Sequence, residues 1–194
     1  MSRPALSSLR ALLHRYRAQE TGVAAIEFAL IAPILIALWL GTVELSQGLS
    51  VDRRLDQITA SVGDLVARTA KLTEADMSDI FEIVRSAMTP YPEEEVGVVV
   101  SAVDIDEEGN ASVAWSRARG PLAAHASGSD VTGEIPASLR RPNSQVIVSE
   151  GSYAFRPALG YTITGTINLS DQHFFVPRES EKVELCGPDE EDCG

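Results

Sequence analysis

One stretch of 21 residues, Val23–Val43 (VAAIEFALIAPILIALWLGTV), constrains this chain more than any other feature. Almost every position in it is apolar or small, and Glu27 is its only charged residue. Because a helix rises about 1.5 Å per residue, a helix of this length spans roughly 30 Å, the thickness of the hydrocarbon core of a bilayer. The stretch therefore predicts a membrane-spanning helix.

Charge is distributed unevenly on the two sides of this stretch. Residues 1–22 carry four arginines and one glutamate, a net charge of +3, whereas residues 23–194 carry 12 basic and 27 acidic residues, a net charge of −15. The positive-inside rule keeps the basic segment in the cytoplasm and exports the acidic body. We therefore expect a single-pass membrane protein with a cytoplasmic N-terminus and an exported C-terminal body. Such an acidic body repels phosphates, so nucleic acid is not an expected partner.

A cleaved secretory signal is the alternative interpretation of the apolar stretch. Signal h-regions have about 7–15 residues and end at a small-residue site of the A-x-A type, which is missing here. The helical spacing of apolar residues also continues past the stretch, and this favours an anchor within one helix from near Val23 to about Ala70. The residues of this second stripe are Val51, Leu55, Ile58, Val62 and Leu65.

Local signals predict a second helix after Leu72. Thr73 and Asp76 have the spacing of a capping box, and Pro90 and Pro92 end the helical pattern. Its apolar face, which we interpret as core, consists of Met77, Ile80, Phe81, Val84 and Met88.

From Val96 onward, the period of the pattern changes from 3.6 to 2. It predicts a hairpin of strands 96–105 and 111–118, a loop over 120–144 with a short helical turn near 136–140, and strands 145–155 and 161–169. Gly151 is a candidate β-bulge, and residues 174–176 are expected to form a brief extended piece. The predicted fold is α+β, with the two helices packed on an antiparallel sheet of about four strands.

The segment Gly22–Pro33 (GVAAIEFALIAP), followed by Gly41 and Glu44, resembles the N-terminal segment of TadE-like proteins, the minor pseudopilins of tight-adherence (Tad/Flp) pili. The resemblance implies a pilin-like fold, a role in pilus assembly and hence in cell adhesion and biofilm formation, and cleavage by a prepilin peptidase between Gly22 and Val23. Other implied partners are pilin or pseudopilin subunits, the inner-membrane assembly platform and membrane lipid. Phe28 stands where the major Flp pilins have tyrosine.

Glu27 would be the fifth residue of the cleaved chain. The resemblance implies that this glutamate pairs with the N-terminal amine of a neighbouring subunit, as in type IV-like pilins. This fits the physics, because a carboxylate within an apolar span costs about 2.5–3.5 kcal/mol at the membrane centre unless it gains a partner. The alternative is that Glu27 sits near the cytoplasmic interface and reaches the lipid headgroups.

The resulting division of the chain is a basic leader (1–22), a transmembrane helix (23–43), an exported α+β domain (44–185) and a C-terminal tail (186–194). The tail contains both cysteines, Cys186 and Cys193, with six residues between them. In an exported domain such a pair predicts a disulfide; a metal site is the alternative, but no histidine lies nearby.

Motifs for catalysis, phosphate binding or metal-dependent hydrolysis are missing, so we expect neither enzymatic activity, nor a cofactor, nor a resident metal. The three histidines, His14, His125 and His173, follow no nucleophile motif. Acidic clusters at 93–95 and 104–108 are either solvated turns or a calcium site.

Two functions of different classes remain open at this point. The first is a cleaved structural component of a pilus. The second is a bilayer-tethered binding or scaffold module outside the cytoplasm, which is not cleaved and tolerates replacement of Glu27.

Overall fold

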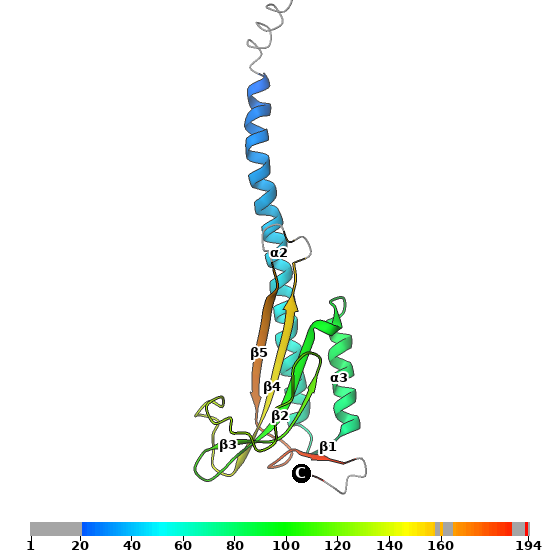
Figure 1. Ribbon diagram of the computed structural model, residues 1–194, viewed down its shortest axis with the longest axis vertical. Coiled ribbons are helices and arrows are strands. Elements are labelled where there is room, and N and C mark those ends of the chain that lie inside the picture. The colour runs from blue at the N-terminus through cyan, green and yellow to red at the C-terminus, as the bar shows by residue number, and fades with distance from the viewer. Residues whose placement is uncertain (1–20, 158–159, 161–164, 188–192, 194) are drawn as a thin grey trace, which may run out of the picture. The chain divides into compact units, whose positions relative to one another are not determined.

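The computed structural model describes residues 21–157, 160, 165–187 and 193 (Figure 1). The described residues fall into two compact units, residues 21–45 with 160 and residues 46–157 with 165–187 and 193. The predicted leader, residues 1–22, lies almost entirely outside the described residues.

Helix α2, Thr21–Ala67, contains the apolar stretch and continues through Pro33. Four residues of the predicted second stripe, Val51, Leu55, Ile58 and Val62, are buried as expected. The prediction that Leu65 lies on this packed stripe is wrong, because Leu65 is 42% exposed, whereas Val66 is fully buried. Val66 follows Val62 by four residues and therefore remains on the packed side of the helix.

Strand β1, Lys71–Thr73, leads into helix α3, Glu74–Met88. The capping box is confirmed: the Asp76 amide donates to Thr73 Oγ1 (3.2 Å), and the Thr73 amide donates to Asp76 Oδ2 (2.8 Å). The buried residues of α3 are Met77, Phe81, Val84 and Met88. A short 3-10 helix, η1 (Glu93–Glu95), precedes the sheet.

The sheet confirms the α+β fold class. Its strands are β2 (Val96–Ile105), β3 (Ala111–Arg119), β4 (Ser144–Phe155) and β5 (Ile167–Phe175). They are antiparallel in the order β3-β2-β4-β5, as Figure 1 shows.

The last strand of this sheet differs from the predicted strand 161–169. Residues 161–164 lie outside the described residues, and Gly165 has φ of +99°, which breaks an extended run before Ile167. Pairing then extends from Phe155 opposite Ile167 to Ile147 opposite Phe175. Phe174 and Phe175, expected in a separate piece, are therefore the end of β5.

Each face of the sheet carries its own core. On one face, α2 and α3 cover a helix-side core that includes Leu55, Phe81, Val100 and Trp115. The opposite face forms a loop-side core, which the loop between β3 and β4 covers with two buried side chains and the partly buried Leu139. The loop-side core consists of Val103, Ile105, Ala111, Val113, Val131, Ile135, Val146 and Val148.

Gly151 is not a bulge, because β4 pairs in continuous register with both neighbours around it. The irregularity lies on β3, where Trp115 pairs with Ala102 and Val113 with Val103. A Cβ on Gly151 would overlap Thr59 Oγ1 and lie 3.1 Å from Leu55 Cδ1. The glycine therefore lets α2 pack directly on the backbone of the sheet.

We predict that Gly151→Ala lowers the free energy of unfolding by about 1–3 kcal/mol, because the added methyl forces α2 away from the sheet. Chemical denaturation of the full chain in detergent measures the loss. Gly133→Ala is the matched control, since no atom lies within 4 Å of the place where its Cβ would be. Equal stability of the two variants would contradict direct packing of the helix on β4.

Candidate functional site

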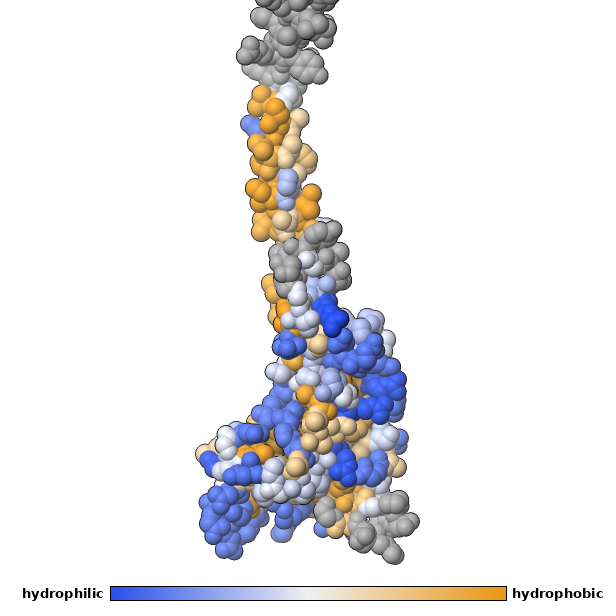
Figure 2. Space-filling view, in the orientation of Figure 1, coloured by the Kyte–Doolittle hydropathy of each residue, from blue (hydrophilic) through white to orange (hydrophobic). Residues whose placement is uncertain are grey.

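The first half of α2 exposes large apolar side chains around its whole circumference. The helix is long and apolar enough to cross a membrane, and Figure 2 shows it as a nearly continuous apolar surface. Phe28 is 70% exposed and Trp39 is 66% exposed. Such a surface needs lipid or other apolar helices around it. Its large exposed residues are Val23, Ile26, Phe28, Leu30, Ile31, Ile34, Leu35, Ile36, Leu38 and Trp39.

Gly22, Val23 and Glu27 lie in the first turns of this helix. Glu27 is exposed and follows Val23 by one helical turn, so the two residues share a face. Glu44, near the other end of the span, is fully buried and has an interaction partner.

The glycine at position 22 has no packing reason in the described part of the chain. No atom lies within 4 Å of the place where its Cβ would be, and its backbone is helical. Gly63 differs, since a Cβ there would overlap the Phe175 ring.

Residues 22–63 match the model of the TadE-like protein family. The match begins at Gly22 and ends at Gly63, in the part of α2 that packs on the sheet. The resemblance predicted from Gly22, Glu27 and the surrounding apolar residues is confirmed over this TadE-like segment. No curated protein and no solved structure matches the chain.

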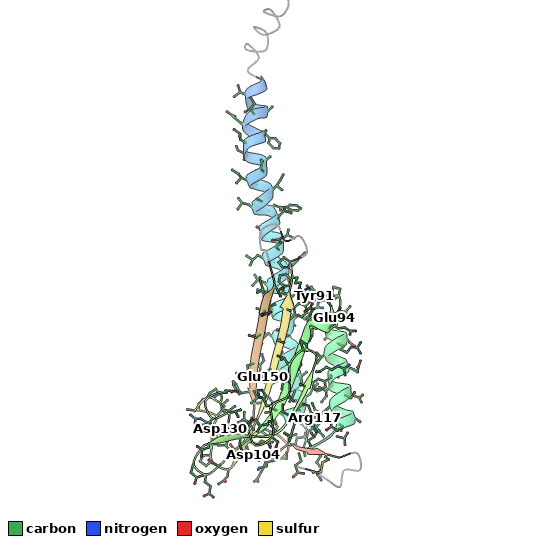
Figure 3. The ribbon with its side chains drawn as sticks, in the orientation of Figure 1. Tyr91, Glu94, Asp104, Arg117, Asp130 and Glu150 are labelled. Carbon is green, nitrogen blue, oxygen red and sulfur yellow. A yellow bond between two sulfur atoms is a disulfide. The ribbon has the colours of Figure 1, made fainter. Side chains whose placement is uncertain are left out.

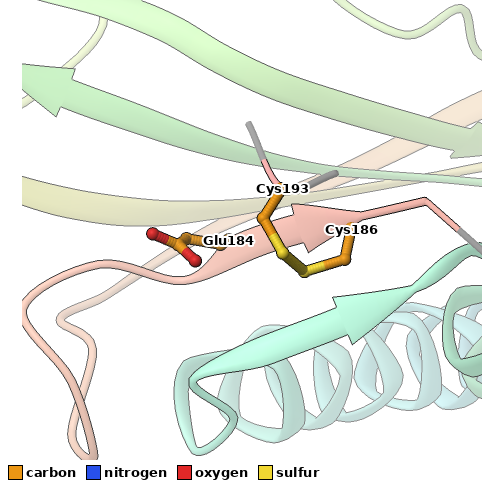
Figure 4. A group of neighbouring side chains, drawn as sticks. All are labelled: Glu184, Cys186 and Cys193. Carbon is orange, nitrogen blue, oxygen red and sulfur yellow. A yellow bond between two sulfur atoms is a disulfide. The ribbon is translucent and has the colours of Figure 1, made fainter. Parts of the chain in front are cut away.

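At the other end of the chain, the structure joins Cys186 and Cys193 in a disulfide (Figure 4). Cys186 ends strand β6 (Glu184–Cys186), which pairs in parallel with β1. Both strands have three residues, too few to show a period, so sequence analysis missed them. A carboxylate oxygen of Glu184 lies close to both sulfurs, but sulfurs bonded to each other are not the thiolates that a metal requires.

Two hydrogen bonds fix the segment before the disulfide to the domain. Trp115 Nε1 donates to the Val183 carbonyl (2.9 Å), and the Val183 amide donates to Gln145 Oε1 (2.7 Å). The three residues that supply these groups are all buried, so this C-terminal segment is an integral part of the domain.

The acidic clusters do not form a common site in the part of the chain that the structure describes. Figure 3 shows Glu94 beside Tyr91 at one end of the sheet and Asp104 at the other. Glu93 pairs with Arg85 (2.7 Å), which lowers the pKa of the Glu93 carboxyl. Asp104 pairs with Lys182 Nζ (2.8 Å), and Asp106 closes the hairpin turn by accepting from the Asn110 amide (2.7 Å).

The two described histidines each contact one carboxylate, which sequence patterns did not predict. His125 Nε2 lies 2.6 Å from Glu150 Oε2, and His173 Nε2 lies 2.9 Å from Asp56 Oδ1. The first contact holds the β3–β4 loop on β4, and the second joins β5 to α2. Both partners are more than 20 residues away in the sequence, beyond the range of a local motif.

Asp171, two residues before His173 on β5, is an unusual carboxylate. Its Oδ2 is buried and has no hydrogen-bond partner among the described residues. Burial raises the pKa of the Asp171 carboxyl, and the charges of Asp52 and Asp56 on α2 raise it further. Asp171 therefore adds a third carboxylate beside Asp52 and Asp56 of α2, and His173 is the group there that lowers its pKa.

We predict that replacing both cysteines by serine destabilises the domain by about 2 kcal/mol, the loop-entropy value for a loop of this length. Thermal unfolding of the full chain in detergent, with and without reductant, measures the effect. Reductant should lower the melting temperature of the wild-type chain but not that of the variant. Equal sensitivity of both would contradict a structural disulfide.

We predict that Asp171→Asn raises the melting temperature at pH 7 by about 2 °C or more. A carboxyl whose pKa is raised by folding stabilises the fold only when protonated, so its contribution is lost as the pH rises through the folded pKa. The difference from wild type should shrink towards acidic pH. Asp130→Asn is the control of opposite sign, because hydrogen bonds from Thr132 lower the pKa of Asp130. The same shift in both variants would contradict this assignment.

Proposed function

We propose that this protein is a minor pseudopilin: a non-enzymatic structural component of a Tad/Flp-type pilus assembly, processed by a prepilin peptidase after Gly22. The observation that carries the proposal is the TadE-like segment, whose match begins at the glycine that the peptidase would recognise. This glycine is unexplained by packing in the described residues, and a protease site is a reason for it that lies outside the fold.

Cleavage after Gly22 would supply Glu27 with a partner. The cut creates an ammonium group on Val23 at the edge of the apolar span, and the exposed carboxylate of Glu27 needs compensation when lipid or helices surround it. A pair between Glu27 of one subunit and the new N-terminus of a neighbour joins two charges that are both costly alone. The glutamate therefore favours helix-to-helix assembly over simple anchoring.

The same proposal gives the chain its orientation and its partners. The arginine-rich leader favours a cytoplasmic N-terminus, and the disulfide favours an oxidising compartment for the domain. The protein is then an inner-membrane protein with a periplasmic or extracellular domain. Its partners are the prepilin peptidase, other pilin or pseudopilin subunits, the assembly platform and lipid, and adhesion and biofilm formation are the cellular outcomes.

We predict that Gly22→Ala blocks processing in the native host, so that the protein keeps its leader. Ala24→Ser, an equally small change inside the mature chain, should be processed normally. Immunoblotting of membranes compares the two sizes. A Gly22→Ala chain of mature size would contradict cleavage at this position.

We predict that Glu27→Gln is processed and remains in the membrane but lowers piliation at least tenfold, because the amide carries no charge for the neighbouring ammonium. Counting of surface fibres by electron microscopy measures the loss, with Glu27→Asp as the variant that keeps a carboxylate. Normal piliation with Glu27→Gln would instead favour the alternative function, a bilayer-tethered binding or scaffold module that is not cleaved.

A further inference from the structure

The two edges of the four-stranded sheet differ in their protection. At β3, backbone hydrogen bonds attach the following loop to the edge: the Val113 amide donates to Ser129 O, and the Val131 amide donates to Ala111 O. At β5, none of the described residues forms backbone hydrogen bonds with the outer side of the strand. Figure 1 shows β5 along the open side of the sheet.

The register of the sheet identifies the free backbone groups. The backbone groups of Ala111 and Val113 form hydrogen bonds with the loop on the outer side of β3. The amide and carbonyl of Ser112, which lies between them, therefore point towards its partner Asp104 on β2. The direction of these backbone groups alternates from residue to residue along β2 and β4. The amides and carbonyls of the odd-numbered residues of β5 therefore point towards β4. The amides and carbonyls that point outward belong to Asn168, Ser170, Gln172 and Phe174.

Strand β5 lacks most of the usual devices that prevent edge pairing; the exception is Asp171, a charged side chain on the helix side. It contains no lysine and no proline, and its nine residues pair with β4 without a register shift. A regular edge of this length is a template for an added strand.

The charges beside the outer edge of β5 indicate what kind of strand can bind there. On the helix side, Asp171 stands near Asp52 and Asp56, and its buried Oδ2 has no partner among the described residues. Side chains directly across a strand pair lie about 4.5–5.5 Å apart, so a cation opposite Asp171 would reach this group. A second β5 carries no lysine or arginine and belongs to a body with a net charge of −15.

We propose that the outer edge of β5 binds an extended strand of a different subunit, which places a lysine or arginine opposite Asp171. This inference rests on the proposed function, because the second subunit belongs to the proposed pilus assembly. It assigns the exported domain a directional contact in addition to the packing of the membrane helix.

Amide hydrogen exchange on the full wild-type chain tests the free edge. In detergent, the amides of residues 168, 170, 172 and 174 should exchange at least 100-fold faster than those of 169, 171 and 173. In host membranes with the assembled system, the even-numbered amides should become protected. Equal protection of both sets in detergent, or no gain in membranes, would overturn the proposal.

Substitution at Ser170 tests the pairing without removing a backbone hydrogen bond to β4, because this residue is exposed and its amide points outward. Ser170→Pro should lower piliation at least tenfold, whereas Ser170→Ala, which keeps the amide, should stay within twofold of wild type. Normal piliation with Ser170→Pro, or an equal loss with Ser170→Ala, would overturn the proposal. If Ser170→Pro fails to fold, the exchange experiment alone decides.

Asp171→Asn separates binding from stability. It should stabilise the isolated chain and yet lower piliation several-fold, whereas a purely structural role would move both readouts together. Loss of piliation with Glu27→Gln but not with Ser170→Pro or Asp171→Asn would leave the pseudopilin function intact and remove the edge contact. Normal piliation with Glu27→Gln together with a loss with Ser170→Pro would keep the edge contact and contradict the pairing of Glu27 with a neighbouring N-terminus.

Discussion

The domain depends on a place where helix α2 lies directly on the sheet backbone. Ser149 Oγ donates to the Thr59 carbonyl (2.7 Å), and beside it Gly151 offers Thr59 a surface without a side chain. Gly63, one turn further along α2, accommodates the Phe175 ring in the same way. These close contacts fix the helix at a short distance from β4 and β5. The remaining apolar residues of the helix-side core then pack around this line of contact.

Local chemistry made much of the fold predictable from the sequence. Thr73 and Asp76 satisfy each other's backbone groups at the start of α3, and Asp106 and Asn110 close the hairpin turn. Both signals depend on residues three or four positions apart. Non-local contacts decided the rest: β1 pairs with β6 across more than 100 residues, and Val131 and Ile135 turn an apparently plain loop into a cover for a second core.

The features of the candidate site also divide into those that local spacing could predict and those that depend on non-local contacts. Gly22 and Glu27 could be proposed as site residues because the proposal depends only on their spacing within one helix, and it stays a prediction. The disulfide could be predicted because only two cysteines occur. The free edge of β5 was hidden, since its position depends on the order of four strands. The burial of Asp171 was hidden for the same reason, because Asp52 and Asp56 approach it only when α2 packs on β5.

Among the described residues, packing explains Gly151 and Gly63 but gives no contact at Gly22, and this contrast supports the central proposal that the helix is cut there before it assembles. Mass spectrometry of the intact protein, purified from native host membranes without reductant, tests the claim most directly. The account predicts a chain that begins at Val23 and retains the Cys186–Cys193 disulfide. A chain that begins at Met1 or Ser2, or at any residue beyond Val43, would contradict it.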